Sequence, residues 1–242
     1  MDLRAEPLKS RPVSDISPIH LRPTAPLAER VLLPGDPGRA LALAQSLTAE
    51  PRMFNHHRGL WGYTGTGPDG EPLTIQSTGM GGPSAAIVLA ELIALGARRA
   101  IRVGTCGALD PGLALGALVV ARESICADGA SRALGAGERV PADPSLTESL
   151  AANAPSAHVG TIVSVDLFYE DDRQRSAHEA LAIEMEAAAL FALGAAEGVP
   201  VACLLTVSDT FNAGGERVRI DDDSLHAAAL AMGTAATGAL AA

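Results

Sequence analysis

Aromatic residues and cysteines are scarce in this sequence. Phenylalanine, tryptophan and tyrosine together make up 3% of the chain, although 48% of its residues are hydrophobic. The hydrophobic content excludes a disordered chain, and alanine, leucine and valine must build most of the core. The three cysteines, Cys106, Cys126 and Cys203, lie far apart and lack the spacing of metal ligands. We therefore expect reduced thiols, a cytoplasmic protein and no metal site.

Positive charge and long apolar runs are also lacking. The formal net charge is −10, which argues against a nucleic-acid backbone as partner. No run approaches the roughly 18–20 apolar residues of a membrane-spanning helix, so no membrane contact is expected. Residues 1–19 have no apolar stretch of the secretory type and are expected to form a flexible arm. A single domain is expected over residues 20–242.

Short apolar runs alternate with helix-like stretches, which is typical of an α/β sheet. The expected strands are residues 30–33, 98–105, 116–125, 157–166 and 199–209, with a hairpin and a further strand in 59–78. One expected helix begins after Asp36, its N-cap, with Pro37 at the first helical position. The other expected helices cover residues 82–97, 143–154, 184–198 and 222–241. No linker or repeat divides the chain, and its length is sufficient for one large core.

Residues 65–70, GTGPDG, match the glycine spacing of a dinucleotide-binding site. Such a site needs this motif between a strand and a helix, so that phosphate lies at the helix N-terminus. Here Pro68, Asp69 and Gly70 lie between two strand-like runs, and these residues are typical of turns. The motif therefore predicts a hairpin turn and no dinucleotide.

Polar residues follow several of the expected strands, at the positions where open α/β sheets build their sites. Arg102 is the least ordinary, because it lies inside the apolar strand AIRVG. A guanidinium stays charged, so its burial requires either a bound anion or an internal carboxylate. Residues 77–84, STGMGGPS, offer backbone N–H groups before a helix and are a weaker indication of an anion site.

Glu184 and Glu186 lie two residues apart in the apolar segment IEMEAAAL. Glutamate is rarely buried without a partner. Considered alone, the pair is most simply interpreted as solvated residues in the first turn of a helix, where the helix dipole favours carboxylates.

Five segments, in this order along the chain, resemble the nucleoside phosphorylase family that includes bacterial purine nucleoside phosphorylase and uridine phosphorylase. They are AERVLLPGDPGRA, FNHHRGLWGYTG, STGMGGPSAAIVLAELIALGARRAIRVGTCGAL, SVDLFY, and IEMEAAALF with TVSD. The resemblance runs from about His20 to the C-terminal helix. It implies one α/β domain with a mixed, barrel-like β-sheet surrounded by helices. It also implies a homo-oligomer, usually a hexamer built as a trimer of dimers.

The activity implied by the resemblance is phosphorolysis of a purine (deoxy)ribonucleoside. Inorganic phosphate, a co-substrate and not a cofactor, attacks C1′ and yields free base and (deoxy)ribose 1-phosphate. The implied phosphate-binding residues are Gly35, Arg39, Arg102, Thr105 and, donated by the neighbouring subunit, Arg58. The implied ribose-binding residues are Glu184 near the hydroxyls, Met185 on the sugar face, Glu186 at the 2′- and 3′-hydroxyls, and the neighbour's His20 near the 5′ position.

At the base, the resemblance assigns Cys106, Gly107, Phe168, Ser208 and Asp209, with Phe168 stacking on the ring. Asp209 matches a general acid that protonates or hydrogen-bonds N7 of a purine. Arg217 matches the arginine that assists it. Because the segment between them is shorter than in the hexameric purine enzyme, Arg219 is an alternative.

Other activities stay open at this point. STGMGGPS and residues 128–132, DGASR, resemble the uridine branch, but Arg173, Gln174 and Arg175 do not match the register of its uracil-reading residues. The Ser208–Asp209 pair favours a purine over uridine. Methylthioadenosine phosphorylase, a nucleosidase that uses water, and a binding protein without catalysis are minor alternatives.

Overall fold

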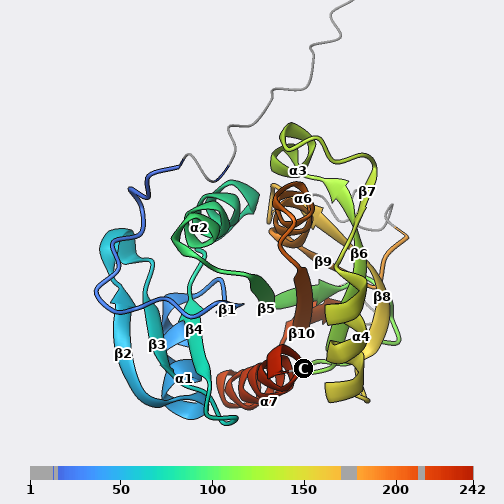
Figure 1. Cartoon of the computed structure of the whole chain (residues 1–242). Coiled ribbons are helices and arrows are strands. Elements are labelled where there is room, and N and C mark those ends of the chain that lie inside the picture. Colours follow the sequence, from blue (N-terminus) through green and yellow to red (C-terminus); the bar gives the residue numbers. More distant parts are fainter. Residues whose placement is uncertain (1–12, 14–15, 170–178, 212–215, 242) are drawn as a thin grey trace, which may run out of the picture.

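The structure is a computed structural model that describes residues 13, 16–169, 179–211 and 216–241 (Figure 1). Most of the expected N-terminal arm, and Arg173, Gln174 and Arg175, lie outside these residues. The described part forms one sheet of eleven strands with helices around it.

Five strands of this sheet close into a barrel. In order around the ring they are β10 (Val201–Phe211), β6 (Leu118–Ala127), β8 (His158–Val165), β9 (Ala182–Glu184) and β5 (Arg99–Ala108). Strand β10 closes the ring because it pairs with β6 in antiparallel fashion and with β5 in parallel fashion. The mixed, barrel-like sheet predicted for a nucleoside phosphorylase is therefore confirmed.

The sheet extends beyond the barrel from β5. The added strands are β1 (Arg30–Leu33), β4 (Pro72–Gln76), β3 (Gly62–Thr66) and β2 (Ala49–Asn55). The GTGPDG motif forms the turn of the β3–β4 hairpin, where Asp69 pairs with Arg30, so its interpretation as a turn is confirmed. Four strands were not predicted from the sequence: β2, β9, and two short strands, β7 (Arg139–Pro141) beside β6 and β11 (Arg217–Arg219) beside β10.

The helices are α1 (Pro37–Leu47), α2 (Gly82–Leu95), α3 (Gly129–Ala133), α4 (Pro144–Asn153), α6 (Ala187–Glu197) and α7 (Asp222–Ala241). Two ends follow from local chemistry as predicted. Asp36 caps α1 by accepting a hydrogen bond from the Arg39 backbone N–H at 2.6 Å, and Gly96 ends α2 with φ of 116°. Two helices differ from the expectation: α6 begins at Ala187 and not at Glu184, and α3 was not predicted.

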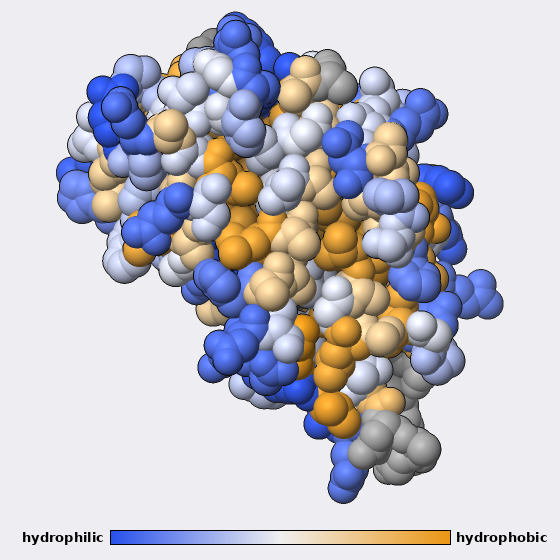
Figure 2. Space-filling model, turned by 90° about the horizontal axis from the view of Figure 1, so that it is seen from below, coloured by the Kyte–Doolittle hydropathy of each residue, from blue (hydrophilic) through white to orange (hydrophobic). Residues whose placement is uncertain are grey.

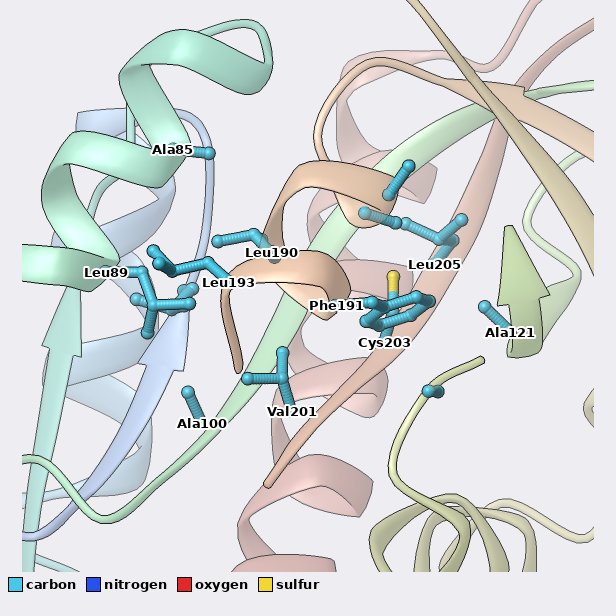
Figure 3. Close-up of a cluster of buried hydrophobic side chains, with 14 of the residues drawn as sticks. Ala85, Leu89, Ala100, Ala121, Leu190, Phe191, Leu193, Val201, Cys203 and Leu205 are labelled. Atoms are coloured by element: carbon cyan, nitrogen blue, oxygen red, sulfur yellow. The ribbon is translucent and has the colours of Figure 1, made fainter. Parts of the chain in front are cut away.

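Alanine-rich helices fit closely against the barrel. Leu89 of α2 and Leu193 of α6 lie side by side in the core cluster between the two helices (Figure 3). A Cβ atom at Gly194 of α6 would lie 2.5 Å from Cγ2 of Val201 on β10, which is closer than atoms approach. Small side chains therefore allow the close packing that a core with few aromatics requires.

On the face shown in Figure 2, apolar residues gather toward the middle and hydrophilic residues surround them. Among the helices that the structure describes, none combines the length and hydropathy needed to cross a bilayer.

Candidate active site

A cavity of about 370 Å³ brings together most of the residues singled out in the sequence. His20 and Arg58 do not line it. The predicted site residues that do are Gly35, Arg39, Arg102, Thr105, Cys106, Gly107, Phe168, Glu184, Met185, Glu186, Ser208, Asp209 and Arg217.

The sheet topology explains this gathering. Strands β1, β5 and β10 run parallel as neighbours, so the residues at their carboxyl ends meet at one edge. Strand β9 runs antiparallel to β5, with Ile183 opposite Gly107. The residues after Ile183 therefore lie beside successively earlier residues of β5, so the Glu-Met-Glu segment approaches Arg102.

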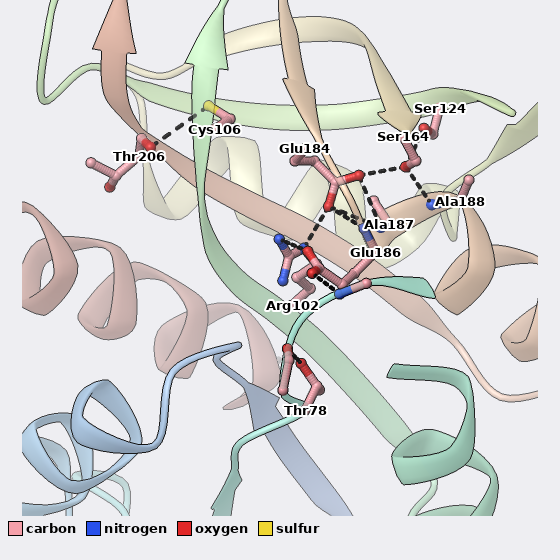
Figure 4. Close-up of polar contacts among 12 residues, drawn as sticks. Thr78, Arg102, Cys106, Ser124, Ser164, Glu184, Glu186, Ala187, Ala188 and Thr206 are labelled. Atoms are coloured by element: carbon pink, nitrogen blue, oxygen red, sulfur yellow. Dashed lines mark hydrogen bonds and ion pairs between the residues drawn. The ribbon is translucent and has the colours of Figure 1, made fainter. Parts of the chain in front are cut away.

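Arg102 forms the centre of the polar network (Figure 4). Its Nε donates to Oε2 of Glu184 at 2.8 Å, and its Nη2 lies 2.5 Å from Oε2 of Glu186. Burial alone would lower the pKa of Arg102, but the Glu186 and Glu184 carboxylates raise it above its ordinary value. Its Nη1 has no hydrogen-bond partner among the described residues. Arg102 is thus paired with two internal carboxylates, and its Nη1 group remains available to donate to a bound anion.

Gly104 makes room for this arginine. A Cβ atom at Gly104 would lie 2.7 Å from Cζ of Arg102, because residues two apart on a strand face the same side. Gly104 was not among the predicted site residues, although the sequence carries a signal for it, a glycine two positions after an arginine within an apolar strand.

Glu184 explains why α6 begins late. Its carboxylate accepts hydrogen bonds from the backbone N–H groups of Glu186 at 2.9 Å and Ala187 at 3.0 Å, and from the Ser164 hydroxyl. It therefore caps the helix from outside while it pairs with Arg102. Burial raises the pKa of Glu184, and the Arg102 charge opposes this. The interpretation of this pair as solvated residues in a helical turn is wrong, because both side chains are buried and paired.

Glu186 is held from two sides. Besides Arg102, the Gly81 backbone N–H donates to its Oε1 at 2.5 Å. The amide of Gly79 donates to the Gly35 carbonyl at 3.0 Å. These amides of the STGMGG loop, which the sequence suggested as an anion site, are therefore used by the protein itself, and one of them binds the Glu186 carboxylate.

The Arg39 guanidinium lies near that of Arg102. Burial lowers the pKa of Arg39; Asp36 opposes the shift and the Arg102 charge adds to it. No carboxylate in the described part of the chain forms an ion pair with Arg39. Two neighbouring guanidinium groups, with one unpartnered Nη1, form a site suited to a multiply charged anion.

Asp209 and Arg217 form a second ion pair in the same cavity. Arg217 Nε donates to Oδ1 of Asp209 at 2.6 Å, and the Ser208 hydroxyl donates to Oδ2 at 3.0 Å. The Cζ atom of Arg217 lies 4.4 Å from the centre of the Phe168 ring, a cation–π distance. Arg219 is exposed and outside the cavity, so Arg217 is the arginine that contacts Asp209.

Cys106, Cys126 and Cys203 are free and buried, as expected for reduced thiols. Burial raises the pKa of Cys106 and of Cys203 well above the ordinary thiol value. Cys106 lines the cavity as a small, protonated side chain.

His20 and Arg58 lie elsewhere on the chain. His20 contacts Glu91 of α2, and Arg58 is exposed on a short 3₁₀ turn (His57–Gly59), with φ of 58°. Partial desolvation and the nearby charges of Arg22, Arg58, His56 and His20 lower the pKa of His57. These residues lie together on the surface, and the two arginines, Arg22 and Arg58, make the cluster cationic.

The cavity also contains residues outside the predicted site set: Asp36, Pro37, Gly79, Met80, Gly104, Val165, Leu167 and Ile183. Gly79 and Met80 belong to the segment STGMGGPS, which the sequence indicated as an anion site, and Asp36 and Pro37 were expected only as the start of a helix. Val165, Leu167 and Ile183 are apolar, and nothing in their local sequence distinguishes them from core residues. Among the described residues, no cluster of three or more histidine, cysteine, aspartate or glutamate side chains is arranged to hold a metal ion.

Comparison with known proteins agrees with this geometry. The family model of the phosphorylase superfamily matches residues 29–241. DeoD-type purine nucleoside phosphorylases are similar: the Oceanobacillus iheyensis protein is 36% identical over 78% of this chain and 86% of its own. The Clostridium novyi protein is 37% identical with the same coverage. A crystal structure of uridine phosphorylase from Vibrio fischeri ES114 superposes with a TM-score of 0.78 and 24% identity, covering 89% of this chain and 92% of that one.

Proposed function

This chain belongs to the phosphorylase superfamily, and we propose that it is a purine nucleoside phosphorylase. It uses inorganic phosphate to cleave a purine (deoxy)ribonucleoside into free base and (deoxy)ribose 1-phosphate. One observation carries the proposal: a single cavity has paired arginines with a spare donor, a buried carboxylate beside them, and an Asp209–Arg217 pair next to an aromatic ring.

Phosphate binds between Arg39 and Arg102, with Thr105 and Gly35 beside it. The unpartnered Nη1 of Arg102 gives the phosphate a charge-assisted hydrogen bond without breaking the two ion pairs of that side chain. Arg102 is already held by Glu184 and Glu186, so little reorganisation is needed when phosphate arrives.

Glu186 accepts hydrogen bonds from the ribose 2′- and 3′-hydroxyls, and Met185 packs on the sugar. Both Glu184 oxygens already accept several protein hydrogen bonds, so we assign the direct contact with the hydroxyls to Glu186. Glu184 then holds Arg102 and the start of α6. The negative charge of Glu186 stabilises the cationic, oxocarbenium-like sugar of the transition state.

Asp209 first takes up a proton from solvent and then supplies it to N7, while the bond between C1′ and the base breaks and the bond from phosphate oxygen to C1′ forms. Arg217 stabilises the carboxylate that remains on Asp209. Phe168 stacks on the base, and its contact with Arg217 places the ring beside the acid.

The site is completed by a second subunit. His20 and Arg58 lie outside the cavity of their own chain, in a cationic cluster on its surface. A neighbouring chain would bring this cluster over the phosphate and the 5′ end of the ribose. We place the enzyme in a hexamer built as a trimer of dimers, in the cytoplasm, working in purine salvage without a cofactor.

The test is a nucleoside panel incubated with and without phosphate, followed by measurement of free base. Inosine, guanosine, adenosine, methylthioadenosine and uridine form the panel. We expect base release from a purine nucleoside only when phosphate is present. Equal rates without phosphate would identify a nucleosidase, faster cleavage of uridine would overturn the purine assignment, and no turnover would indicate a binding protein.

A further inference from the structure

Helix α2 carries one buried carboxylate that the proposed mechanism does not use. Its sequence, GPSAAIVLAELIAL, contains a single charged residue, Glu91, and that residue is only 3% exposed. A carboxylate buried on an apolar helix face costs stability unless it is well paired. The groups that donate hydrogen bonds to the Glu91 carboxylate therefore indicate the role of this residue.

All these partners lie in one short segment about seventy residues earlier in the chain. The backbone N–H groups of Ile19, His20 and Leu21 donate to the Glu91 carboxylate at 3.1, 3.0 and 2.7 Å. Leu21 is buried next to this contact, whereas Ile19 is exposed. Glu91 thus fixes the backbone on both sides of His20.

The same carboxylate also holds the ring of His20. Nδ1 of His20 lies 2.6 Å from Oε1 of Glu91. Burial alone would raise the pKa of Glu91, but the hydrogen bonds from His20 and the backbone hold it below its usual value. An ionised carboxylate only accepts hydrogen bonds, so Nδ1 must carry the proton. In the neutral ring Nε2 is then an acceptor.

Nε2 is available for such a contact. Among the described residues no group donates to Nε2 or accepts from it, and the His20 side chain is 26% exposed. The ring is therefore held at one nitrogen and presents the other at the surface of the cationic cluster.

We propose that Glu91 is a positioning residue that fixes the His20 tautomer and ring, so that Nε2 accepts a hydrogen bond from the 5′-hydroxyl of the substrate. This inference rests on the proposed function, in which His20 approaches the 5′ position in a neighbouring subunit. The pair selects nucleosides with a free 5′-hydroxyl. A 5′-hydrogen or a 5′-thioether offers no donor to Nε2, and such substrates gain nothing from the pair.

The test is a thermodynamic cycle that compares two enzymes, each with two substrates. The wild-type enzyme and Glu91→Gln are assayed with the best purine nucleoside of the panel and with its 5′-deoxy analogue. In this variant the side-chain NH₂ group, which is a donor, would face either Nδ1 of His20 or the backbone N–H groups. These groups are donors too, so one of the hydrogen bonds is lost. We expect kcat/KM for the 5′-hydroxyl substrate to fall about tenfold, and that for the 5′-deoxy analogue by less than about twofold.

Two further variants identify the route of the effect. His20→Ala should show the same selective loss, and the double variant should lose no more than either single one, because Glu91 acts through His20. Thr24→Val is the matched control. It removes a different anchor of the same segment, the Thr24 hydroxyl bond to the Met53 carbonyl at 2.7 Å, and should leave the substrate ratio unchanged.

A spectroscopic measurement needs no substitution. The ¹⁵N shifts of His20 in the wild-type protein should show a protonated Nδ1 and an unprotonated Nε2. The opposite tautomer overturns the inference, and so does an equal loss on both substrates in Glu91→Gln, which would indicate general destabilisation. If no nucleoside is cleaved, the proposed function fails, while the ¹⁵N result still decides whether Glu91 sets the tautomer.

Discussion

Arg217 reaches Asp209 diagonally across the β10–β11 ladder: its Nε lies 2.6 Å from Oδ1, although the residue directly opposite Asp209 is Arg219. The diagonal contact leaves the Arg217 guanidinium over the Phe168 ring. One side chain thus links the Asp209 carboxylate to the Phe168 ring, and Arg219 remains outside the cavity.

Substitution of Asp209 by asparagine should slow natural purine nucleosides by about 10²–10⁴-fold, the usual contribution of a general acid. Nucleosides of 7-methylated purines, whose leaving group needs no proton, should be affected much less. Arg217→Ala should show part of the same selective loss, whereas the neighbouring control Arg219→Ala should not. A uniform loss on both substrate types in Asp209→Asn would show that the residue is structural.

Substitution of Arg39 by alanine should raise the KM for phosphate. Loss of one charge-assisted hydrogen bond is worth about 1.5–3 kcal/mol, roughly ten- to a hundredfold. Arg39 is a cleaner target than Arg102, because removal of Arg102 leaves two buried carboxylates unpaired at about 3–5 kcal/mol of stability. The exposed Arg98→Ala is the control, and an unchanged phosphate KM in Arg39→Ala would place phosphate elsewhere.

Substitution of Glu186 by glutamine keeps the volume and removes the charge. We expect kcat to fall by about 10²–10³-fold while nucleoside affinity changes little, because the charge matters most when the sugar becomes cationic. Steady-state and single-turnover kinetics separate the two effects. A variant in which only KM rises would mean that Glu186 binds substrate and transition state equally.

Two inactive variants should restore activity in each other if the site is shared. Arg58→Ala removes a residue that is outside its own cavity, and Asp209→Asn removes one inside it. In a mixed dimer one site loses both residues and the other keeps both. Since random mixing makes half of the dimers mixed, about a quarter of wild-type activity should return.

The control for this experiment mixes Asp209→Asn with Glu186→Gln. Both residues line their own chain's cavity, so no mixed dimer contains an intact site and activity should stay low. If confirmed mixed oligomers of the first pair are as inactive as their parents, Arg58 does not act across an interface.

The three thiols should be unreactive in the folded protein at neutral pH. Burial raises the pKa of each cysteine, so the thiols stay protonated at pH values up to and above the ordinary thiol pKa. The thiolate, which is the form that reacts with iodoacetamide, is therefore scarce. Labelling of the native protein at pH 8 should be at least about tenfold slower than labelling in urea. Fast labelling of the native enzyme that substrate prevents would show an accessible, activated Cys106.

The sequence by itself determined the elements whose signals are local. Asp36 and Pro37 start α1, Gly96 ends α2, and the turn residues of 65–70 form a hairpin, because each depends on the conformational preferences of a few adjacent residues. The order of five segments along the chain also identified the family, and with it most of the residues that line the cavity.

Only the tertiary structure decided how these residues are used. Glu186 binds the Gly81 amide across 105 residues, Glu184 pairs with Arg102 across 82, and Glu91 holds His20 across 71. The alanine-rich run after Glu184 predicts a helix from local propensity, yet pairing of β9 with β5 and the two ion pairs delay its start to Ala187. Buried charges must find partners wherever the fold supplies them, and the choice between Arg217 and Arg219 is likewise made by the distances in the folded chain and not by their positions in the sequence.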